Sequence, residues 1–579
     1  MTARTAAPAD VANRLDLLLD SLRGPGLPFA AETLTELDRT ETFPAEACAF
    51  LDAFGLRRYY VPAEHGGALD DLSVVMTMLR SVSRVDLTVA ASHGKTYLGA
   101  VSTWIAGEPE AARRLGARIT AGETVSCALT ERDHGSDLLA GEVTARPAPD
   151  GGWLLNGEKW LINSATRAGL VTVLARTAEA GGPRGFSLFL VDKSRLPAGA
   201  FSALPKVPTY GIRGADISGI AFHDAPLPED ALIGAVGQGV ETIVKALHLT
   251  RTGCAAMSLG AGDQALRLAA EFTQGAGTAT IPIAQLSYIR RELGNAAAGQ
   301  LLADAVGLVA MRSVHALTGE MSVVSAVAKA FVPSQVDENI ARLLQLLAPY
   351  GLLGPSGDPH GTFAKLERDH RIIGIFDGSS LVNRNALIEQ FSRLVRAYRK
   401  GRWDAAGLAE ATGAHVPLRP FRPDALSLLS GDGASVVAGL ADTVAQVRAI
   451  ASAPLADLTE RVLDATSRLH EDMAQVRFPP RAVPAHAFDL AERYELCFAA
   501  ASALHLWVRT SPAGGDETWL RGCLVKALAE LGEKVDDTEL DVLDDLADAL
   551  VSRPPGTFRT LLDHLDETGP ADSREATAP

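Results

Sequence analysis

The chain has 579 residues, about four times the roughly 150 residues of a typical domain, so we expect two to four domains. Hydrophobic residues make up 47% and charged residues 21%, a balance typical of folded globular proteins. The 54 basic and 70 acidic residues give a net charge of −16. So acidic a surface repels nucleic-acid phosphates and anionic lipid, which disfavours nucleic-acid binding as the main function.

Five cysteines are scattered along the chain without a CxxC pair: Cys48, Cys127, Cys254, Cys497 and Cys523. An odd, dispersed set argues against a disulfide framework and against a zinc site, and it fits a reducing cytoplasm. The first residues have no apolar stretch typical of a secretory signal. No run reaches the roughly 18 apolar residues of a membrane span, and the closest, 496–508, predicts a buried helix. We therefore expect a cytoplasmic protein that binds neither membranes nor a metal ion.

The order of predicted elements divides the chain into four regions. Over 1–123, apolar residues recur at helical spacing and predict an N-terminal helical domain. Over 124–239, short β-rich runs alternate with Gly, Pro, Asp and Asn, which predicts a small, mostly antiparallel barrel or sandwich. Long helical patterns over 240–400 predict a helical bundle. After a proline-rich linker at 415–426, a further helical block completes an extra helical extension over 401–579. The predicted fold class is mostly α with a central β domain.

The β-rich runs of the second region number six. They are 124–131, 153–157, 159–163, 170–177, 185–192 and 217–225.

Three segments carry residues suited to chemistry. The first, 128–140 (ALTERDHGSDLLA), offers hydroxyls and a Gly-Ser turn after a strand, which suits a polar ring edge or a phosphate as well as an ordinary turn. The second, 157–164 (GEKWLINS), puts Trp160 on a strand, where Trp most often packs in a core. The third, 367–380 (ERDHRIIGIFDGSS), places Asp377 after an apolar run and before Gly, a position for a poised base or for a helix cap.

In this order and on this layout, the three segments resemble the signatures of the acyl-CoA dehydrogenase family of flavoproteins. The first matches ALTExxxGSDxxA except at His134, where a small residue is usual. The second is similar to GxKxWIxN through Gly157, Lys159, Trp160 and Asn163, and the third is similar to RDxRIxxIYEGT. The stretch 206–239 is similar to the family's strand with its VP and GxG passage. The resemblance extends from about residue 15 to 399, roughly two-thirds of the chain.

The resemblance implies an FAD enzyme that removes the α-proton and β-hydride of an acyl thioester and gives a trans-2-enoyl thioester. By position, Asp377 would be the base, and its backbone N–H would polarise the thioester carbonyl together with a flavin hydroxyl. Gly378 and Arg251 would contact the substrate, and Ser136 would contact the cofactor or the pantetheine arm.

The same resemblance assigns the remaining cofactor contacts. Thr130 would hydrogen-bond the pyrimidine edge of the flavin, with Leu129 beside it, and Trp160 would shield the ring. Ser379 would also contact the cofactor. Ile162 replaces the threonine that reaches flavin N5 in the family, so only its backbone N–H would remain for that contact.

Several residues depart from the family pattern. The base is usually Glu, and Asp377 is one methylene shorter; about 1 Å of misplacement costs about 10²-fold in rate. Some relatives carry their base directly before the helix arginine, where this chain has Thr250. We favour a working Asp377, because the motif around it is intact. The loop 345–351 and the segment 274–278 lack family residues on the pyrophosphate side, and we still expect FAD to bind.

The extension resembles, in position and helical character, that of longer family members, which implies a homodimer. Its helical pattern is broken at 477–484 and 510–518. The carrier of the acyl group is coenzyme A or an acyl carrier protein, and an electron-transferring flavoprotein or another acceptor would reoxidise the flavin. The alternatives are a flavin oxidase or monooxygenase on the same fold, or an impaired subunit that pairs with an active paralogue.

A carrier protein is acidic, so it would need a basic patch at the pocket mouth of this acidic chain. The candidates for that patch are Arg132, Arg167, Arg213 and the region 384–402.

Overall fold

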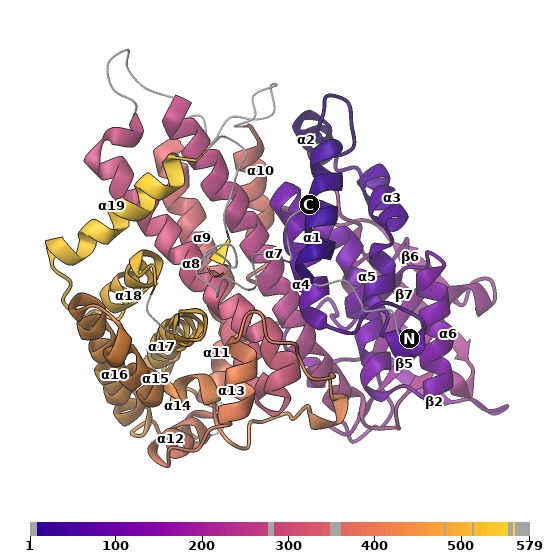
Figure 1. Ribbon diagram of the computed structural model, residues 1–579. Helices are drawn as coiled ribbons and strands as arrows, with labels where there is room; N and C mark the ends of the chain where they lie inside the picture. Colours follow the sequence, from indigo (N-terminus) through magenta and orange to yellow (C-terminus); the bar gives the residue numbers. More distant parts are fainter. Residues whose placement is uncertain are drawn as a thin grey trace, which may run out of the picture. The chain divides into compact units, whose positions relative to one another are not determined.

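The computed structural model describes residues 8–275, 283–347, 361–479, 482–511, 515–553, 560, 561 and 565. The chain divides into two compact units (Figure 1). The first unit comprises 1–253 and 422–428, and the second comprises 254–421 and the residues from 429 onward. The helix α7 (Gly239–Gly275) therefore contributes residues to both units. The finer division into four domains stays a prediction.

Six α-helices precede the sheet within the described part of the first unit: α1 (Pro8–Ser21), α2 (Ala31–Arg39), α3 (Ala45–Phe54), α4 (Leu72–Val85), α5 (Leu87–Ala106) and α6 (Pro109–Thr120). Aspartates fix the starts of the two central helices. The Asp71 side chain accepts a hydrogen bond from the Ser73 N–H at α4, and Asp86 accepts one from the Val89 N–H at α5. These caps satisfy amide groups that have no partner inside the helix, so α4 and α5 begin at defined residues.

The described strands of the first unit form one sheet: β1 (Val125–Ala128), β2 (Thr144–Pro147), β3 (Trp153–Asn163), β4 (Leu170–Arg176), β5 (Phe186–Asp192), β6 (Phe201–Leu204), β7 (Ile217–Leu227) and β8 (Leu232–Ile233). Their order is β6-β7-β3-β2-β4-β5-β8, and β1 pairs with β4 outside this path. Five of the seven pairings between these strands are antiparallel, and β1 and β2 pair with β4 in parallel. The predicted mostly antiparallel β region is confirmed.

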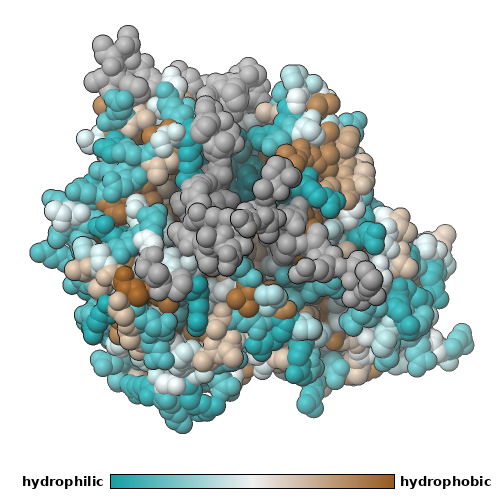
Figure 2. All heavy atoms as spheres, viewed as in Figure 1, coloured by the Kyte–Doolittle hydropathy of each residue, from teal (hydrophilic) through white to brown (hydrophobic). Residues whose placement is uncertain are grey.

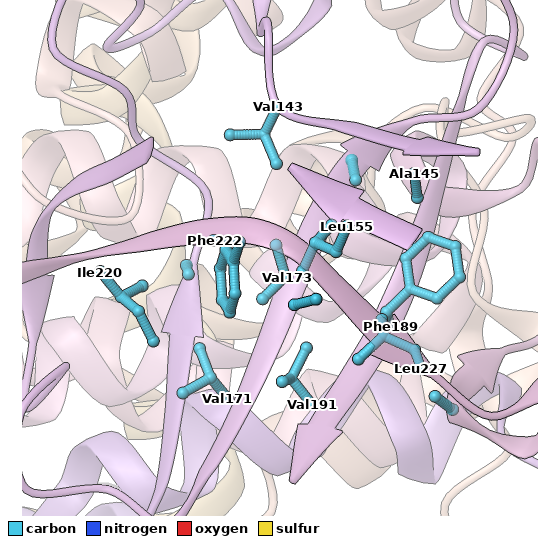
Figure 3. Packing of buried hydrophobic residues seen from close by; sticks show 14 of the residues in the cluster. Val143, Ala145, Leu155, Val171, Val173, Phe189, Val191, Ile220, Phe222 and Leu227 are labelled. Atoms are coloured by element: carbon cyan, nitrogen blue, oxygen red, sulfur yellow. The ribbon is translucent and has the colours of Figure 1, made fainter. Parts of the chain in front are cut away.

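A hydrophobic core fills one face of this sheet (Figure 3). Leu155, Phe189 and Phe222 come from three different strands, are almost fully buried and lie in the same cluster. Alternate residues of a strand point to opposite faces, so the apolar positions of each strand collect on this side. The core leaves the other positions of β1 and β3 for polar contacts.

Specific contacts join the sheet to the helices of the first unit. The Asn163 side-chain amide donates to the Ala91 carbonyl of α5 at 3.1 Å, and the Thr172 hydroxyl donates to the Gly99 carbonyl at 2.7 Å. A Cβ atom at Gly99 would lie 2.7 Å from the Val125 backbone, so only glycine allows this approach. The motif residue Asn163 therefore has a structural role: it fixes the end of β3 on α5.

The second unit is helical in its described residues. After α7 come α8 (Ser287–Ala316), α9 (Met321–Leu347), α10 (Gly361–His370), α11 (Ser380–Ile388) and α12 (Phe391–Arg399). The helix α8 is long and apolar enough to cross a membrane, but 94% of its most apolar window is buried inside the protein. Burial against α9 and the extension is what a core helix requires.

The extension adds α13 (Ala405–Thr412), α14 (Ser435–Ala438), α15 (Leu440–Ile450), α16 (Ala453–Met473), α17 (Ala485–Thr510), α18 (Thr518–Glu530) and α19 (Asp537–Val551). The helices α17, α18 and α19 pack against α8. The predicted buried helix 496–508 is confirmed as part of α17. The predicted break 477–484 directly precedes α17, and the predicted break 510–518 begins at the last residue of α17 and ends at the first residue of α18. Polar residues dominate the visible surface over α12 and α16 (Figure 2).

Ion pairs fasten the extension to the bundle. Arg290 and Arg291 of α8 pair with Asp548 and Asp544 of α19. Arg384 of α11 pairs with Glu495 of α17 at 2.9 Å, and this glutamate is fully buried. The helix α11 begins at the end of the segment that carries the predicted base, Asp377. This ion pair therefore connects the extension to the helix that follows the predicted base.

Candidate functional site

Thr130 and Trp160 are neighbours at the end of β1. The backbone N–H of Trp160 donates a 3.0 Å hydrogen bond to the backbone carbonyl of Thr130, and both residues are half-buried. Leu129 is also half-buried directly before Thr130. The two residues that the sequence assigns to the flavin edge and the flavin ring are thus brought together in the first unit.

A buried ion pair holds the loop that carries Thr130. Lys159 Nζ lies 2.7 Å from Glu131 Oε1 and donates to the Leu129 carbonyl at 2.9 Å. The Glu131 carboxylate also accepts from the N–H groups of Glu142 and Val143. Lys159 therefore contacts the residues on both sides of Thr130, the Leu129 carbonyl and the Glu131 carboxylate.

The electrostatics of this pair favour its ionised form. Burial raises the pKa of Glu131, but the Lys159 charge and the two amide donors outweigh burial, so the pKa of this carboxyl lies below its usual value. Burial lowers the pKa of Lys159, and the Glu131 charge opposes that shift. The short contacts and the complete set of donors support a charged pair, which rigidifies the loop.

A β-bulge next to Trp160 sets the direction of the neighbouring side chains. Leu161 has φ of 55°, and the pairing of β3 with β7 shifts register between Trp160 and Ile162. The Ile162 side chain consequently lies in the hydrophobic core at 2% exposure. Only its backbone is left for a cofactor contact, as the sequence predicts. The Arg132 guanidinium lies 4.7 Å from the centre of the Trp160 ring, so it covers part of the indole.

Ser136 lies in an exposed loop after β1, and Asp137 caps the short turn that follows. His134, the departure from the first family signature, is half-buried, and its Nε2 lies 3.3 Å from Glu142 Oε1. Ser136 is therefore accessible, and its contact with cofactor or pantetheine stays a prediction.

Asp377 lies on a tight turn between α10 and α11 in the second unit. Its φ is 56° and that of Gly378 is 91°, so two successive residues adopt the left-handed conformation. A residue with a side chain is disfavoured there, and surrounding structure must hold it. The Asp377 side chain is half-buried. Ser379 caps α11 by accepting from the Val382 N–H at 3.3 Å.

A buried lysine supports this turn from α9. Lys329 has no exposed surface, and its Nζ donates to the Ile373 carbonyl at 2.7 Å and to the Gly378 carbonyl at 3.0 Å. Asn383 also donates to the Gly378 carbonyl, at 2.9 Å. The backbone is thus fixed on both sides of Asp377, and the strained conformation is retained.

The carboxylate of Asp377 has a contact of its own. Cys254 of α7 places its Sγ 3.6 Å from Asp377 Oδ2, within hydrogen-bonding range for sulfur. Arg251 is buried one turn earlier on the same helix. Thr250, the alternative base position, holds a buried hydroxyl for which the described residues supply no hydrogen-bond partner.

A serine, a histidine and an aspartate also meet near this turn. His370 Nε2 lies 2.7 Å from Ser258 Oγ, and His370 Nδ1 lies 2.7 Å from Asp337 Oδ1. Ser258 and His370 have no exposed surface, so no substrate reaches the hydroxyl. The arrangement resembles a nucleophilic triad only in geometry. Its hydrogen bonds join α7, α9 and α10.

The departures on the pyrophosphate side fall largely on residues outside the described ranges. Gln345 lies at the end of α9, but 348–351 is not described, and neither is 276–278. The described residues contain no group of three or more His, Cys, Asp or Glu side chains placed to hold a metal ion.

The predicted cofactor residues of the sheet, Thr130, Trp160 and Ile162, fit part of a flavin. A flavin presents a flat ring with a polar edge, and the sheet offers a half-exposed indole beside a half-exposed hydroxyl on a rigid loop. Thr130 would take the polar edge and Trp160 the ring face, and the Ile162 N–H would remain as a donor. The buried Lys159–Glu131 pair lies beneath this surface, so the donors keep their positions without a ligand.

Two family models match segments of the chain that contain the residues described above. The acyl-CoA dehydrogenase middle domain matches residues 126–225, and the acyl-CoA dehydrogenase C-terminal domain matches residues 237–391. The chain belongs to the acyl-CoA dehydrogenase family. Members of this family are FAD-dependent oxidoreductases that act on a CH–CH group, and this protein is an enzyme of that type with FAD as its cofactor.

Similar proteins extend over different shares of the chain. The human mitochondrial short-chain specific acyl-CoA dehydrogenase is 28% identical over 382 residues, which cover 64% of this chain and 87% of that protein. The structure of an acyl-CoA dehydrogenase with FAD from Bacillus anthracis is similar over 98% of this chain and 95% of its own, at 19% identity and a TM-score of 0.70. The prolyl acyl carrier protein oxidase AnaB covers 67% of this chain and 99% of its own, at 17% identity and a TM-score of 0.59.

Sequence reasoning missed two residues that contact the turn of Asp377, namely Lys329 and Cys254. Lys329 had a usable signal, because a single charge inside the apolar helical run 323–332 must be buried with partners. Cys254 had none, because a cysteine on an apolar helix is most often a packing residue. Lys159 was matched as a motif residue, but its ion pair with Glu131 appears only in the structure.

Proposed function

We propose that the protein catalyses the α,β-dehydrogenation of an acyl thioester to the trans-2-enoyl thioester, with Asp377 as the base that removes the α-proton. The observation that carries the proposal is the support of Asp377. Its carboxylate is half-buried on a turn whose backbone is fixed by Lys329. A base whose backbone is held in this way is positioned before the substrate binds.

The reaction divides between this carboxylate and the cofactor. The Asp377 carboxylate accepts the α-proton while a double bond forms between the α- and β-carbons of the acyl chain. When bound, FAD supplies the acceptor for the hydride that leaves the β-carbon. The Asp377 N–H polarises the thioester carbonyl and so makes the α-proton more acidic. Gly378, Arg251 and Ser136 contact the substrate in this proposal.

The cofactor contacts come from the sheet. Thr130 and Leu129 take the pyrimidine edge, Trp160 shields the ring, and the backbone of Ile162 faces the reactive edge. Ser379 is a further cofactor contact in this proposal. The rigid loop that carries Thr130 supports this assignment, because the Lys159–Glu131 pair fixes the donor positions.

We propose coenzyme A as the carrier of the acyl group. Four of the arginines that an acidic carrier protein could contact are engaged within the chain. Arg213 pairs with Glu41 at 3.2 Å, Arg384 with Glu495 at 2.9 Å, and Arg132 with Glu158 at 3.1 Å. The Arg167 guanidinium lies 4.0 Å from the centre of the Phe43 ring. The likeness to AnaB makes an acyl carrier protein the alternative outcome of the test.

The remaining partners rest on the family resemblance. We propose an electron-transferring flavoprotein as the acceptor that reoxidises the flavin, and a homodimer in the cytoplasm. The fold of the Bacillus anthracis structure is similar over 98% of this chain, so the likeness includes the extension.

Replacement of the base tests the reaction. In Asp377→Asn, the purified protein should keep its flavin absorption, and bleaching of that absorption by acyl-CoA without oxygen should fall by more than about 10³-fold, because the amide cannot accept the proton. Asp432→Asn removes an exposed carboxylate from the extension and is the control, with bleaching unchanged.

Full bleaching in Asp377→Asn would overturn the base assignment. Bleaching of the unmodified protein by acyl carrier protein thioesters but by no acyl-CoA would replace the carrier. Rapid reoxidation of the reduced flavin by oxygen would favour an oxidase.

A further inference from the structure

We propose that Cys254 is a positioning residue for the base: its thiol donates a hydrogen bond to Oδ2 of Asp377 and so orients the carboxylate toward the α-proton. The inference rests on the proposed function, because it concerns the same carboxylate. It goes further by assigning a role to a residue of α7 that belongs to none of the three motifs.

The contact is built from rigid parts. Cys254 is 1% exposed in the interior of the helix α7, so its thiol is fixed by packing and shielded from water. The distance of 3.6 Å from Sγ to Oδ2 is appropriate for a thiol donor. A carboxylate accepts such a bond in its ionised form, which is the form that a base needs.

The turn explains why this contact matters. Lys329 fixes the backbone at Ile373 and Gly378, whereas the Cys254 thiol contacts the side-chain carboxylate of Asp377 itself. A hydrogen bond to one carboxylate oxygen restricts rotation of the group. An aspartate reaches less far than the glutamate usual in the family, so its two oxygens must be aimed more closely to stay productive. Lys329 sets the position of the base, and Cys254 sets its direction.

Another buried cysteine provides a matched comparison. Cys523 of α18 has no exposed surface, and its Sγ lies 3.8 Å from the backbone carbonyl of Ala298. Its thiol thus faces a backbone carbonyl of α8, whereas the thiol of Cys254 faces the Asp377 carboxylate. Replacement of either cysteine removes the same atoms from a buried site, but only Cys254 is bonded to the carboxylate.

The experiment compares donor and non-donor side chains at the two positions in the full-length holoenzyme. Cys254→Ser keeps a donor, Cys254→Ala removes it, and Cys254→Val removes it while filling the volume of the thiol. Stopped-flow bleaching of the flavin by acyl-CoA without oxygen gives the rate of the chemical step and the apparent affinity for the acyl-CoA separately. Cys523→Ser and Cys523→Ala are the controls, and flavin content and thermal midpoint report folding.

We expect bleaching in Cys254→Ala and Cys254→Val to slow by about tenfold, the effect of losing one hydrogen bond to a charged group. The apparent affinity for acyl-CoA should stay unchanged, and Cys254→Ser should recover the rate to within about threefold of the unmodified protein. A purely packing role predicts the opposite order, because Val fills the site better than Ser. Equal rates in Ser, Ala and Val variants would therefore overturn the proposal.

Asp377→Asn separates this proposal from the proposed function. If Asp377→Asn still bleaches, the base assignment fails and the role of Cys254 with it. If Asp377→Asn is inactive while Cys254→Ala is as fast as the unmodified protein, only the role of Cys254 fails.

Discussion

The loop at Thr130 and the turn at Asp377 are each held by a buried lysine, but the two lysines act on different partners. Lys159 faces the Glu131 carboxylate and forms an ion pair. Lys329 donates to two backbone carbonyls and so braces a left-handed turn. The comparison shows that one buried ion pair can hold the loop after a strand, whereas a strained turn needs donors on both sides of the strained residue.

The residues that hold the two regions also differ in their distance along the chain. Lys159 lies 28 residues from Glu131, and the two residues belong to the second and the first family signature, respectively. Lys329 lies 49 residues from Gly378, and Cys254 lies 123 residues from Asp377. The sheet region is thus specified locally, and the base turn depends on helices that reach it only through tertiary packing.

The largest effect is expected from breaking the ion pair in the sheet. Lys159→Met leaves the buried Glu131 carboxylate without its cation, which should lower the free energy of unfolding by about 3–5 kcal/mol and reduce flavin retention. Thermal unfolding and flavin content are the measurements. Arg146→Met removes the exposed partner of Asp224 on the same sheet and should change neither.

A double variant, Lys159→Met with Glu131→Gln, distinguishes loss of the ion pair from loss of packing. Because it leaves no buried charge, it should recover a large part of the lost stability. A double variant that is less stable than Lys159→Met would contradict the role assigned to the pair.

The next effect concerns the brace of the base turn. Lys329→Met should keep the flavin but slow its bleaching by acyl-CoA by about 10²-fold, because the Ile373 and Gly378 carbonyls lose their common donor and the base moves. Stopped-flow absorption without oxygen measures this rate. Lys526→Met removes another buried lysine, paired with Glu530 at 2.5 Å in the extension, and should cost stability without changing the rate. Equal rate losses in both variants would contradict a specific role for Lys329.

The smallest effect concerns the start of the helix that carries Lys329. Glu320 directly precedes α9, and its carboxylate accepts from the Ser435 N–H at 2.7 Å and the Ser435 hydroxyl at 2.5 Å. Burial raises the pKa of Glu320 to about 7. The folded protein therefore binds this proton more tightly than the unfolded chain does. The stabilisation is complete below about pH 4.5 and is lost as the pH rises to about 7.

For this carboxyl, the loss between about pH 5 and pH 8 amounts to about 2 kcal/mol. Glu320→Gln should make the thermal midpoint less dependent on pH over this interval, because the amide has no proton to lose. An unchanged difference between the two midpoints would show that another group governs the pH dependence of the second unit.

The sequence was sufficient for most of the fold. Periodicity predicted helices before the sheet, the β-rich sheet region and helices after it in the correct order, because each pattern reflects burial of one face. It missed β2, β6 and β8, which are short, and it divided β3 at Gly157. That glycine has φ of 120° at a register shift, so the strand continues through a residue that normally marks a turn.

By itself, the sequence predicted the family, the cofactor and the candidate base, because its motifs resemble the signatures of the acyl-CoA dehydrogenase family. Only the tertiary structure decided how these groups are held. The burial of Ile162, the brace from Lys329 and the thiol contact from Cys254 join elements far apart in the chain. Such contacts depend on the packing of whole helices and on the register of a sheet, and neither is encoded in a local pattern of residues.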